Sequence, residues 1–83
     1  MELQLKVIDD NNGYNSPFEM DIIIDNDKTI LDLKHEINRL DNNIIDKSYI
    51  EYNLKINDLI ITSNTLILYD TNIVSGCEIF IVF

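Results

Sequence analysis

Residues 25–43 read DNDKTILDLKHEINRLDNN, and in this stretch the apolar period of the chain changes from that of a strand to that of a helix. The apolar residues recur at i, i+3, i+7 and i+10, which places them on one helix face: Ile30, Leu33, Ile37 and Leu40. Thr29 is a candidate N-cap, with Asp32 at the spacing of a capping box. The polar run DNN at 41–43 ends the pattern. The sequence therefore predicts one amphipathic helix here.

Two runs before the helix alternate in the manner of half-buried strands. In residues 1–8, one set of side chains points inward (Leu3, Leu5 and Val7) and the other outward (Glu2, Gln4, Lys6 and Ile8). In residues 18–25, the inward set is Phe18, Met20, Ile22 and Ile24. The polar loop between the runs contains Gly13, so the two strands are expected to form a hairpin with a long turn.

Three more strands are expected after the helix. A strand over 47–56 has Ile50, Tyr52 and Leu54 on one face, and a short strand at 59–62 is followed by a turn and then a loop or short helical turn. Ile73 is expected in the core. The last strand, 77–83, has its own inward set (Ile79, Ile81 and Phe83) and outward set (Glu78, Phe80 and Val82).

The order of these elements predicts the architecture. The first and last strands are the most apolar, so we expect them to pair in the centre of the sheet, with the helix as a crossover on one face. The prediction is an α+β β-grasp: a mixed sheet of four to five strands, one main helix, and a single domain over residues 1–83.

Charge and composition narrow the classes of partner. The chain has 83 residues and a net charge of −9, so it can hardly build the basic patch that nucleic acid or an anionic membrane requires. A basic protein surface suits it better, although plain solubility explains such a charge equally well. With one cysteine, no signal peptide and no apolar run of about 20 residues, we expect a cytoplasmic protein without direct membrane insertion.

Three stretches, taken in order, resemble ubiquitin-like proteins over the whole chain: MELQLKV, KTILDLKHEI and LYDTNIVSGCEIFIV. Within that group the chain most resembles the small YukD/EsaB-like proteins of Gram-positive type VII secretion, which are similar in length and in the SPFEMDIII strand. This resemblance implies a cytosolic accessory component whose protein partner is the cytosolic part of a membrane secretion machine. A ubiquitin-like interaction domain excised from a larger eukaryotic protein remains the alternative.

The residue pattern favours binding over chemistry. His35 lies opposite the apolar stripe of the helix and Cys77 begins the last strand, so no Cys–His dyad is expected. The acidic runs at 9–12 and 25–28 lack calcium-loop spacing, and no zinc set or phosphate loop is visible, so no metal or cofactor is expected. The resemblance also implies that conjugation needs a Gly-Gly tail. The sequence ends instead at Phe83, so we expect an unconjugated protein.

The outward side chains of the sheet form the predicted interaction face. Its candidate residues are Ile8, Tyr49, Glu51, Phe80 and Val82, with Lys6 nearby. Adjacent exposed apolar side chains often mark interfaces, but scattered surface hydrophobes are common. In the family comparison, Glu51 falls where the central Ile of the recognition surface is expected. Ile23 and Leu31, also outward by periodicity, are expected to form a second small patch or to pack under the long loop. Self-association through the interaction face or an open sheet edge is a further hypothesis.

Overall fold

The structure is a computed structural model that describes residues 1–9, 18–40 and 52–82, without the side chain of Phe18. The predictions for Gly13, Tyr49, Ile50, Glu51 and Phe83 lie outside the described residues. The elements are strands β1 (Glu2–Asp9), β2 (Phe18–Asp25), β3 (Asn53–Ile56), β4 (Leu59–Ile61) and β5 (Glu78–Val82), helix α1 (Ile30–Leu40) and a 3₁₀ helix (Leu68–Thr71).

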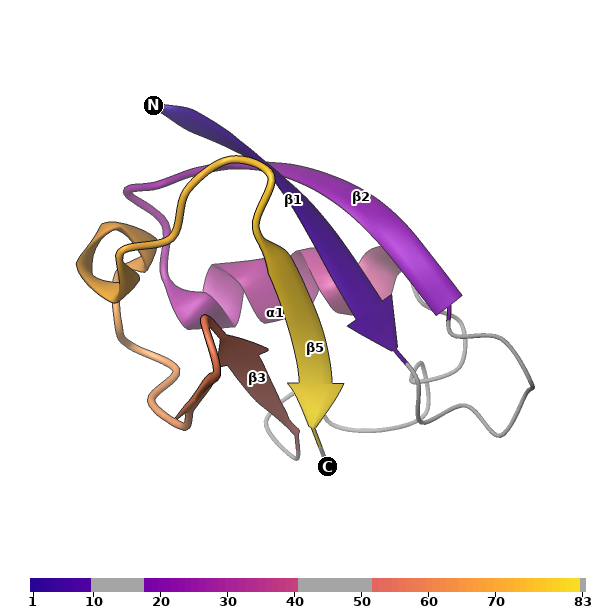
Figure 1. Cartoon of the computed structure of the whole chain (residues 1–83). Coiled ribbons are helices and arrows are strands. Elements are labelled where there is room, and N and C mark those ends of the chain that lie inside the picture. The colour runs from indigo at the N-terminus through magenta and orange to yellow at the C-terminus, as the bar shows by residue number, and fades with distance from the viewer. Residues whose placement is uncertain (10–17, 41–51, 83) are drawn as a thin grey trace.

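The five strands form one mixed sheet in the order β2-β1-β5-β3-β4. The central pair, β1 and β5, is parallel with Val7 opposite Ile79, and the other neighbours are antiparallel. α1 crosses one face of this sheet, with the two central strands in front of it (Figure 1). The predicted α+β class, the central pairing and the packing of one main helix on one sheet face are confirmed within the described residues.

The core lies between α1 and the inner face of the sheet. Buried side chains come from every strand predicted to alternate and from the helix stripe: Leu3, Leu5, Val7, Met20, Ile22, Ile24, Ile30, Leu33, Ile37, Tyr52, Leu54, Ile56, Ile79 and Ile81. Leu68 of the 3₁₀ helix and Ile73, which was predicted to be inward, close one end of the core. Burial of these apolar side chains is the main favourable contribution to folding.

A two-residue turn joins β3 to β4. Asn57 and Asp58 both have positive φ, 52° and 64°, as in the type I′ turns that match the twist of a hairpin. The turn sets the register, with Ile56 opposite Leu59 and Lys55 opposite Ile60. The short strand predicted at 59–62 is therefore confirmed as β4, and the turn places Ile60 beside Lys55.

The N-terminus of α1 is capped as predicted. The Thr29 hydroxyl accepts from the Asp32 N–H at 3.2 Å, and the Thr29 N–H donates to Asp32 Oδ2 at 3.0 Å. The Thr29 N–H and the Thr29 hydroxyl, which donates to the same oxygen at 3.1 Å, hold the pKa of the Asp32 carboxyl below its usual value. The next N–H groups, of Ile30 and Leu31, donate to the carbonyl oxygens of residues 66 and 64. The helix start is thus tied to the segment that follows β4.

Lys34 of α1 is a buried cation, with 1% of the residue exposed. Its ammonium donates to the Tyr52 carbonyl oxygen and to Asn64 Oδ1, both at 2.7 Å, and lies 5.3 Å from the centroid of the Tyr52 ring. Burial lowers the pKa of the Lys34 ammonium because the charged form loses hydration. Lys34 therefore links the helix to the residue before β3 and to the segment after β4.

Replacing Thr29 by Ala removes the cap hydroxyl and should lower the free energy of unfolding by about 1 kcal/mol at pH 7. Thr29→Ser, which keeps the hydroxyl, should cost much less. Because the folded pKa of Asp32 is depressed, its contribution is present above the unfolded value of 3.8 and is lost as the pH falls through the folded pKa. Urea unfolding should therefore show that the difference in free energy of unfolding between the unmodified protein and Thr29→Ala becomes smaller in acid. A difference that stays constant with pH would contradict a cap that depends on the carboxylate.

Replacing Lys34 by Met keeps an unbranched side chain of similar length but leaves two acceptors without this donor. We therefore expect the free energy of unfolding to fall by about 1–3 kcal/mol at pH 7. The folded pKa of Lys34 is lowered, so the unfolded chain binds more protons as the pH approaches 10.5, and the contribution of Lys34 to stability rises with pH in that range. The measurement is urea unfolding of both proteins from neutral to alkaline pH. The deficit of the Met variant should widen with pH, and a constant deficit would contradict a buried, desolvated ammonium.

Candidate functional site

The sheet face opposite α1 carries one row of side chains that crosses four strands. Directly opposed residues of neighbouring strands share a face, and the register pairs Ile8 with Phe80, Phe80 with Lys55, and Lys55 with Ile60. These four residues, from β1, β5, β3 and β4, are called the outer row below. The row brings together residues that are far apart in the sequence.

Exposure differs along the outer row. Phe80 is 37% exposed and Ile60 is 53% exposed, whereas Lys55 between them is half-buried. Ile8 is only 6% exposed, so the prediction of an exposed Ile8 is wrong. β1 is an internal strand, and Ile8 is flanked by Glu19 on one side and Phe80 on the other. Ile8 is therefore a buried neighbour of Phe80 rather than part of the exposed surface.

The other predicted face residues have different outcomes. Val82 is half-buried opposite Asn53, one row further along β5. Tyr49 and Glu51 lie outside the described residues. Lys55 lies between the two exposed apolar side chains, Phe80 and Ile60. Neither Lys55 nor Ile60 was among the residues predicted for the interaction face. The Asn57–Asp58 pair between apolar residues was the available signal, because a two-residue hairpin turn fixes this register.

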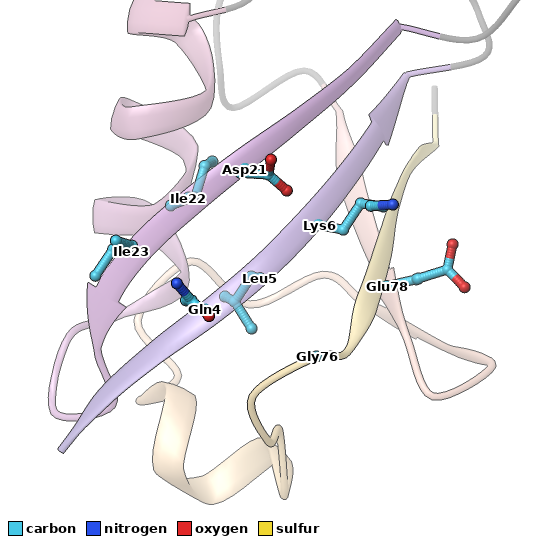
Figure 2. A pocket seen from close by; sticks show the side chains of 8 residues that line it. All are labelled: Gln4, Leu5, Lys6, Asp21, Ile22, Ile23, Gly76 and Glu78. Atoms are coloured by element: carbon cyan, nitrogen blue, oxygen red, sulfur yellow. The ribbon is translucent and has the colours of Figure 1, made fainter.

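Charged side chains border the outer row. In the neighbouring row Lys6 lies opposite both Asp21 and Glu78, and Figure 2 shows these residues around a shallow hollow that Gly76 also lines. A second hollow is lined by Phe80 and Lys55 together with Asp58 and Glu78. The apolar surface thus has one cation within it and carboxylates at its border, a composition suited to a partner with apolar and basic side chains.

The second predicted patch does not form as one surface. Ile23 is exposed on the outer face of β2, whereas Leu31 is half-buried on α1. Ile23 instead lines a hollow with Asp32, His35 and Glu36 of the helix. A charged groove therefore lies beside Ile23, rather than an apolar patch.

The two residues considered for nucleophilic chemistry line different hollows. His35 is exposed beside β2, and Cys77 is partly buried near Asn57, with Sγ 3.6 Å from Asn57 Oδ1. Burial raises the pKa of the Cys77 thiol, which lowers its thiolate fraction and its reactivity. Within residues 1–9, 18–40 and 52–82, no three His, Cys, Asp or Glu side chains gather in a way that could hold a metal ion. No helix in the same ranges is long and apolar enough to cross a bilayer.

Truncating the two ends of the outer row should have very different effects on stability. Ile8→Ala removes a buried side chain and should lower the free energy of unfolding by about 2–4 kcal/mol. Ile60→Ala removes an exposed one and should change it by no more than about 0.5 kcal/mol. Urea unfolding of both variants measures the contrast. Equal losses would mean that Ile60 is packed and that the row is not an open surface.

Comparisons with known proteins agree with this architecture. No family model and no curated protein sequence matches the chain. Solved structures do match: the ubiquitin-like domain of an Arabidopsis thaliana protein has a TM-score of 0.80 at 15% identity, covering 99% of this chain and 77% of that one. The UBL domain of Plasmodium falciparum Dsk2 has a TM-score of 0.77 at 18% identity, covering 99% and 97%.

A third similar structure is the UBL domain of yeast Ddi1, with a TM-score of 0.71 at 15% identity, covering 98% of this chain and 87% of that one. Identities this low establish the fold alone. The helix on one face, the strand order and these neighbours together show that the chain has the ubiquitin-like β-grasp fold.

Proposed function

We propose that this protein is a non-catalytic, unconjugated binding module that recognises a protein partner through the outer row. The observation that carries the proposal is the exposure of Phe80 and Ile60 on either side of Lys55, on the sheet face that α1 leaves open. An antiparallel sheet face open to water normally carries polar side chains. Two large apolar side chains exposed on this face, Phe80 on the middle strand β5 and Ile60 on the edge strand β4, therefore support an interface.

The charge of the module favours a basic partner surface. The chain carries a net charge of −9, and Asp58 and Glu78 line the hollow beside Phe80. Border charges of this kind steer encounter and select partners, while the buried apolar centre supplies most of the affinity. The expected partner surface is thus an apolar patch bordered by Lys or Arg.

In its finer form, the proposal is a cytoplasmic accessory component of a type VII secretion system. Support comes from the resemblance of the sequence to YukD/EsaB-like proteins, with residues 1–83 as one domain. The proposed partner is the cytosolic domain of a membrane component of that machinery, such as its ATPase. The module would act there by binding, with no enzymatic step of its own.

A second candidate is a ubiquitin-like interaction domain of a longer eukaryotic protein. It is favoured by the similarity in structure to the UBL domains of Plasmodium falciparum Dsk2 and yeast Ddi1. The gene distinguishes the two candidates. Coding sequence continuing beyond residue 83 supports the longer protein, and adjacent type VII secretion genes support the accessory component.

The test is a binding measurement with the 83-residue protein and the purified cytosolic domain of the secretion ATPase. Phe80→Asp and Ile60→Asp should each weaken binding at least about thirtyfold, the loss expected for a central interface residue. Ile23→Asp is the matched control, because Ile23 is an exposed isoleucine on the same sheet face but outside the outer row. The control should bind as the unmodified protein does.

Two results would overturn the proposal. If both outer-row variants bind as tightly as the control, the outer row is not the interface. If the unmodified protein does not bind the ATPase domain at all, the type VII assignment is wrong. Circular dichroism of each variant confirms that the fold is retained.

A further inference from the structure

An apolar hollow, distinct from those beside the outer row, lies at the N-terminal end of β1. No outer-row residue lines it. It has a volume of about 570 Å³. Among its lining residues, Leu3 and Ile73 are buried and form the floor, whereas Tyr69 and Val74 are 70% and 64% exposed and form the rim. We call this the end hollow. Large exposed apolar side chains around an apolar floor are typical of a recognition site rather than of scattered surface residues.

The walls of the end hollow are fixed by hydrogen bonds between segments that are distant in sequence. The Asn26 N–H donates to the Met1 carbonyl oxygen at 2.9 Å, and the Tyr69 N–H donates to the Asn26 carbonyl oxygen at 2.9 Å. On the other side, the Gln4 N–H donates to Ser75 Oγ at 3.1 Å. Because these segments are already ordered, a ligand in the hollow needs to order little of the protein.

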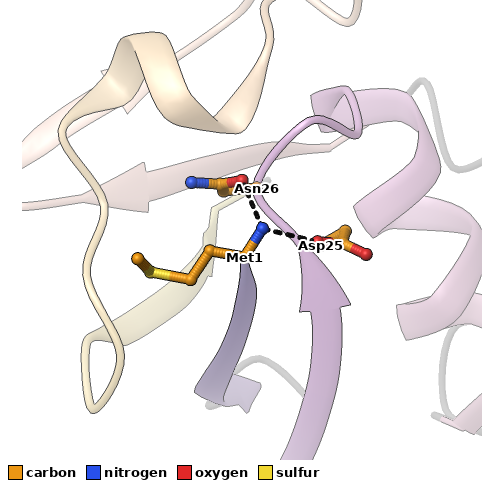
Figure 3. Close-up of polar contacts among 3 residues, drawn as sticks. All are labelled: Met1, Asp25 and Asn26. Atoms are coloured by element: carbon orange, nitrogen blue, oxygen red, sulfur yellow. Dashed lines mark hydrogen bonds and ion pairs between the residues drawn. The ribbon is translucent and has the colours of Figure 1, made fainter.

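Acidic residues stand next in sequence to several residues that line the end hollow. Figure 3 shows the Met1 ammonium donating to Asp25 Oδ1 at 2.9 Å and to Asn26 Oδ1 at 3.3 Å. Asp25 and Asp27 flank the lining residue Asn26 and Glu2 follows Met1 in the sequence. The hydrogen bond and charge of Asp25, with smaller effects of Asp27 and Glu2, raise the pKa of the amine. Asp70 follows Tyr69 in the 3₁₀ helix and is exposed. Four carboxylates therefore belong to residues next in sequence to the lining, and one of them is paired to the amine; we call these four the acidic border.

We propose that the end hollow binds an extended protein segment that inserts one apolar side chain between Tyr69 and Val74 and carries Lys or Arg on both sides of it. The apolar side chain covers the Leu3 and Ile73 floor, and the basic residues meet the acidic border. A second copy of this chain fits poorly, because each copy has a net charge of −9. This site goes beyond the proposed function, since it would let one module hold two partners at once.

The experiment is an NMR titration of the ¹⁵N-labelled 83-residue protein with the peptide acetyl-Arg-Arg-Ser-Leu-Ser-Arg-Arg-amide. We expect saturable shifts of the amides of Asn26, Tyr69, Asn72 and Val74, and little change at Phe80 and Ile60. The same peptide with Ala in place of Leu should bind about tenfold more weakly. The version with Glu in place of Arg should not bind, and added salt should weaken the Arg peptide.

Variants of the protein separate this site from the outer row. Val74→Lys removes an apolar rim side chain and adds a like charge to the basic peptide, so it should weaken binding at least about tenfold. Phe80→Asp should leave peptide binding unchanged, so failure here and failure of the outer-row proposal are distinguishable. Val74 is largely exposed, and a dispersed amide spectrum verifies that the variant is folded.

Four outcomes would overturn the proposal. They are shifts that fail to saturate, shifts centred on the outer row, equal binding of the Glu peptide, and the same shifts appearing without peptide as the protein concentration rises. The last result would show that a second copy occupies the hollow. Saturable shifts that need both Leu and Arg, and that Val74→Lys abolishes, would establish it as a second binding site.

Discussion

The parallel pairing of β1 with β5 is the constraint on which the rest of the fold depends. Val7 and Ile79 face each other at the centre of the sheet, and both are fully buried. Parallel neighbours cannot be joined by a tight turn, so the chain must cross over the sheet between them. β2 then pairs with the free side of β1, β3 with the free side of β5, and α1 covers one face. Because α1 packs on one face of the sheet, it leaves the opposite face open.

The sheet face that α1 leaves open carries one polar row and one row with exposed apolar side chains. Lys6, Asp21 and Glu78 keep one row polar. The next row places Phe80 and Ile60 on either side of Lys55. Since the strand period fixes which residues point outward, these apolar residues cannot turn into the core without a shift of register. Their exposure is built into the pairing of the strands, which is why they are the candidates for function.

Local periodicity was enough to predict most of the fold. The inward sets of β1, β2 and β5, the stripe of α1 and the Thr29–Asp32 cap depend on spacing within a few residues, and the structure confirms them where it describes them. Long-range contacts decided what was missed. The burial of Ile8 depends on its neighbours in two other strands. The position of Ile60 opposite Lys55 depends on the two-residue turn before β4.

Lys34 shows a signal that was present but not used. It follows Ile30 by four residues and precedes Ile37 by three, so it lies on the apolar stripe of the helix. A lysine at such a position must either extend its ammonium to water or find acceptors inside the protein. Here the acceptors are the Tyr52 carbonyl oxygen and the Asn64 amide. Because both come from segments that reach the helix only after folding, the sequence could indicate the buried position but not its partners.

The acidic charge connects the two apolar surfaces. At physiological ionic strength charges are screened over about 8 Å, so the net charge of −9 acts mainly through the carboxylates nearest each surface. Asp58 and Glu78 line a hollow at the outer row, and Asp25 and Asp70 are sequence neighbours of residues that line the end hollow. These carboxylates disfavour contact between two copies and favour partners with Lys or Arg at the same distance from an apolar centre. The charge thus selects the partner, and the apolar side chains it surrounds supply the affinity.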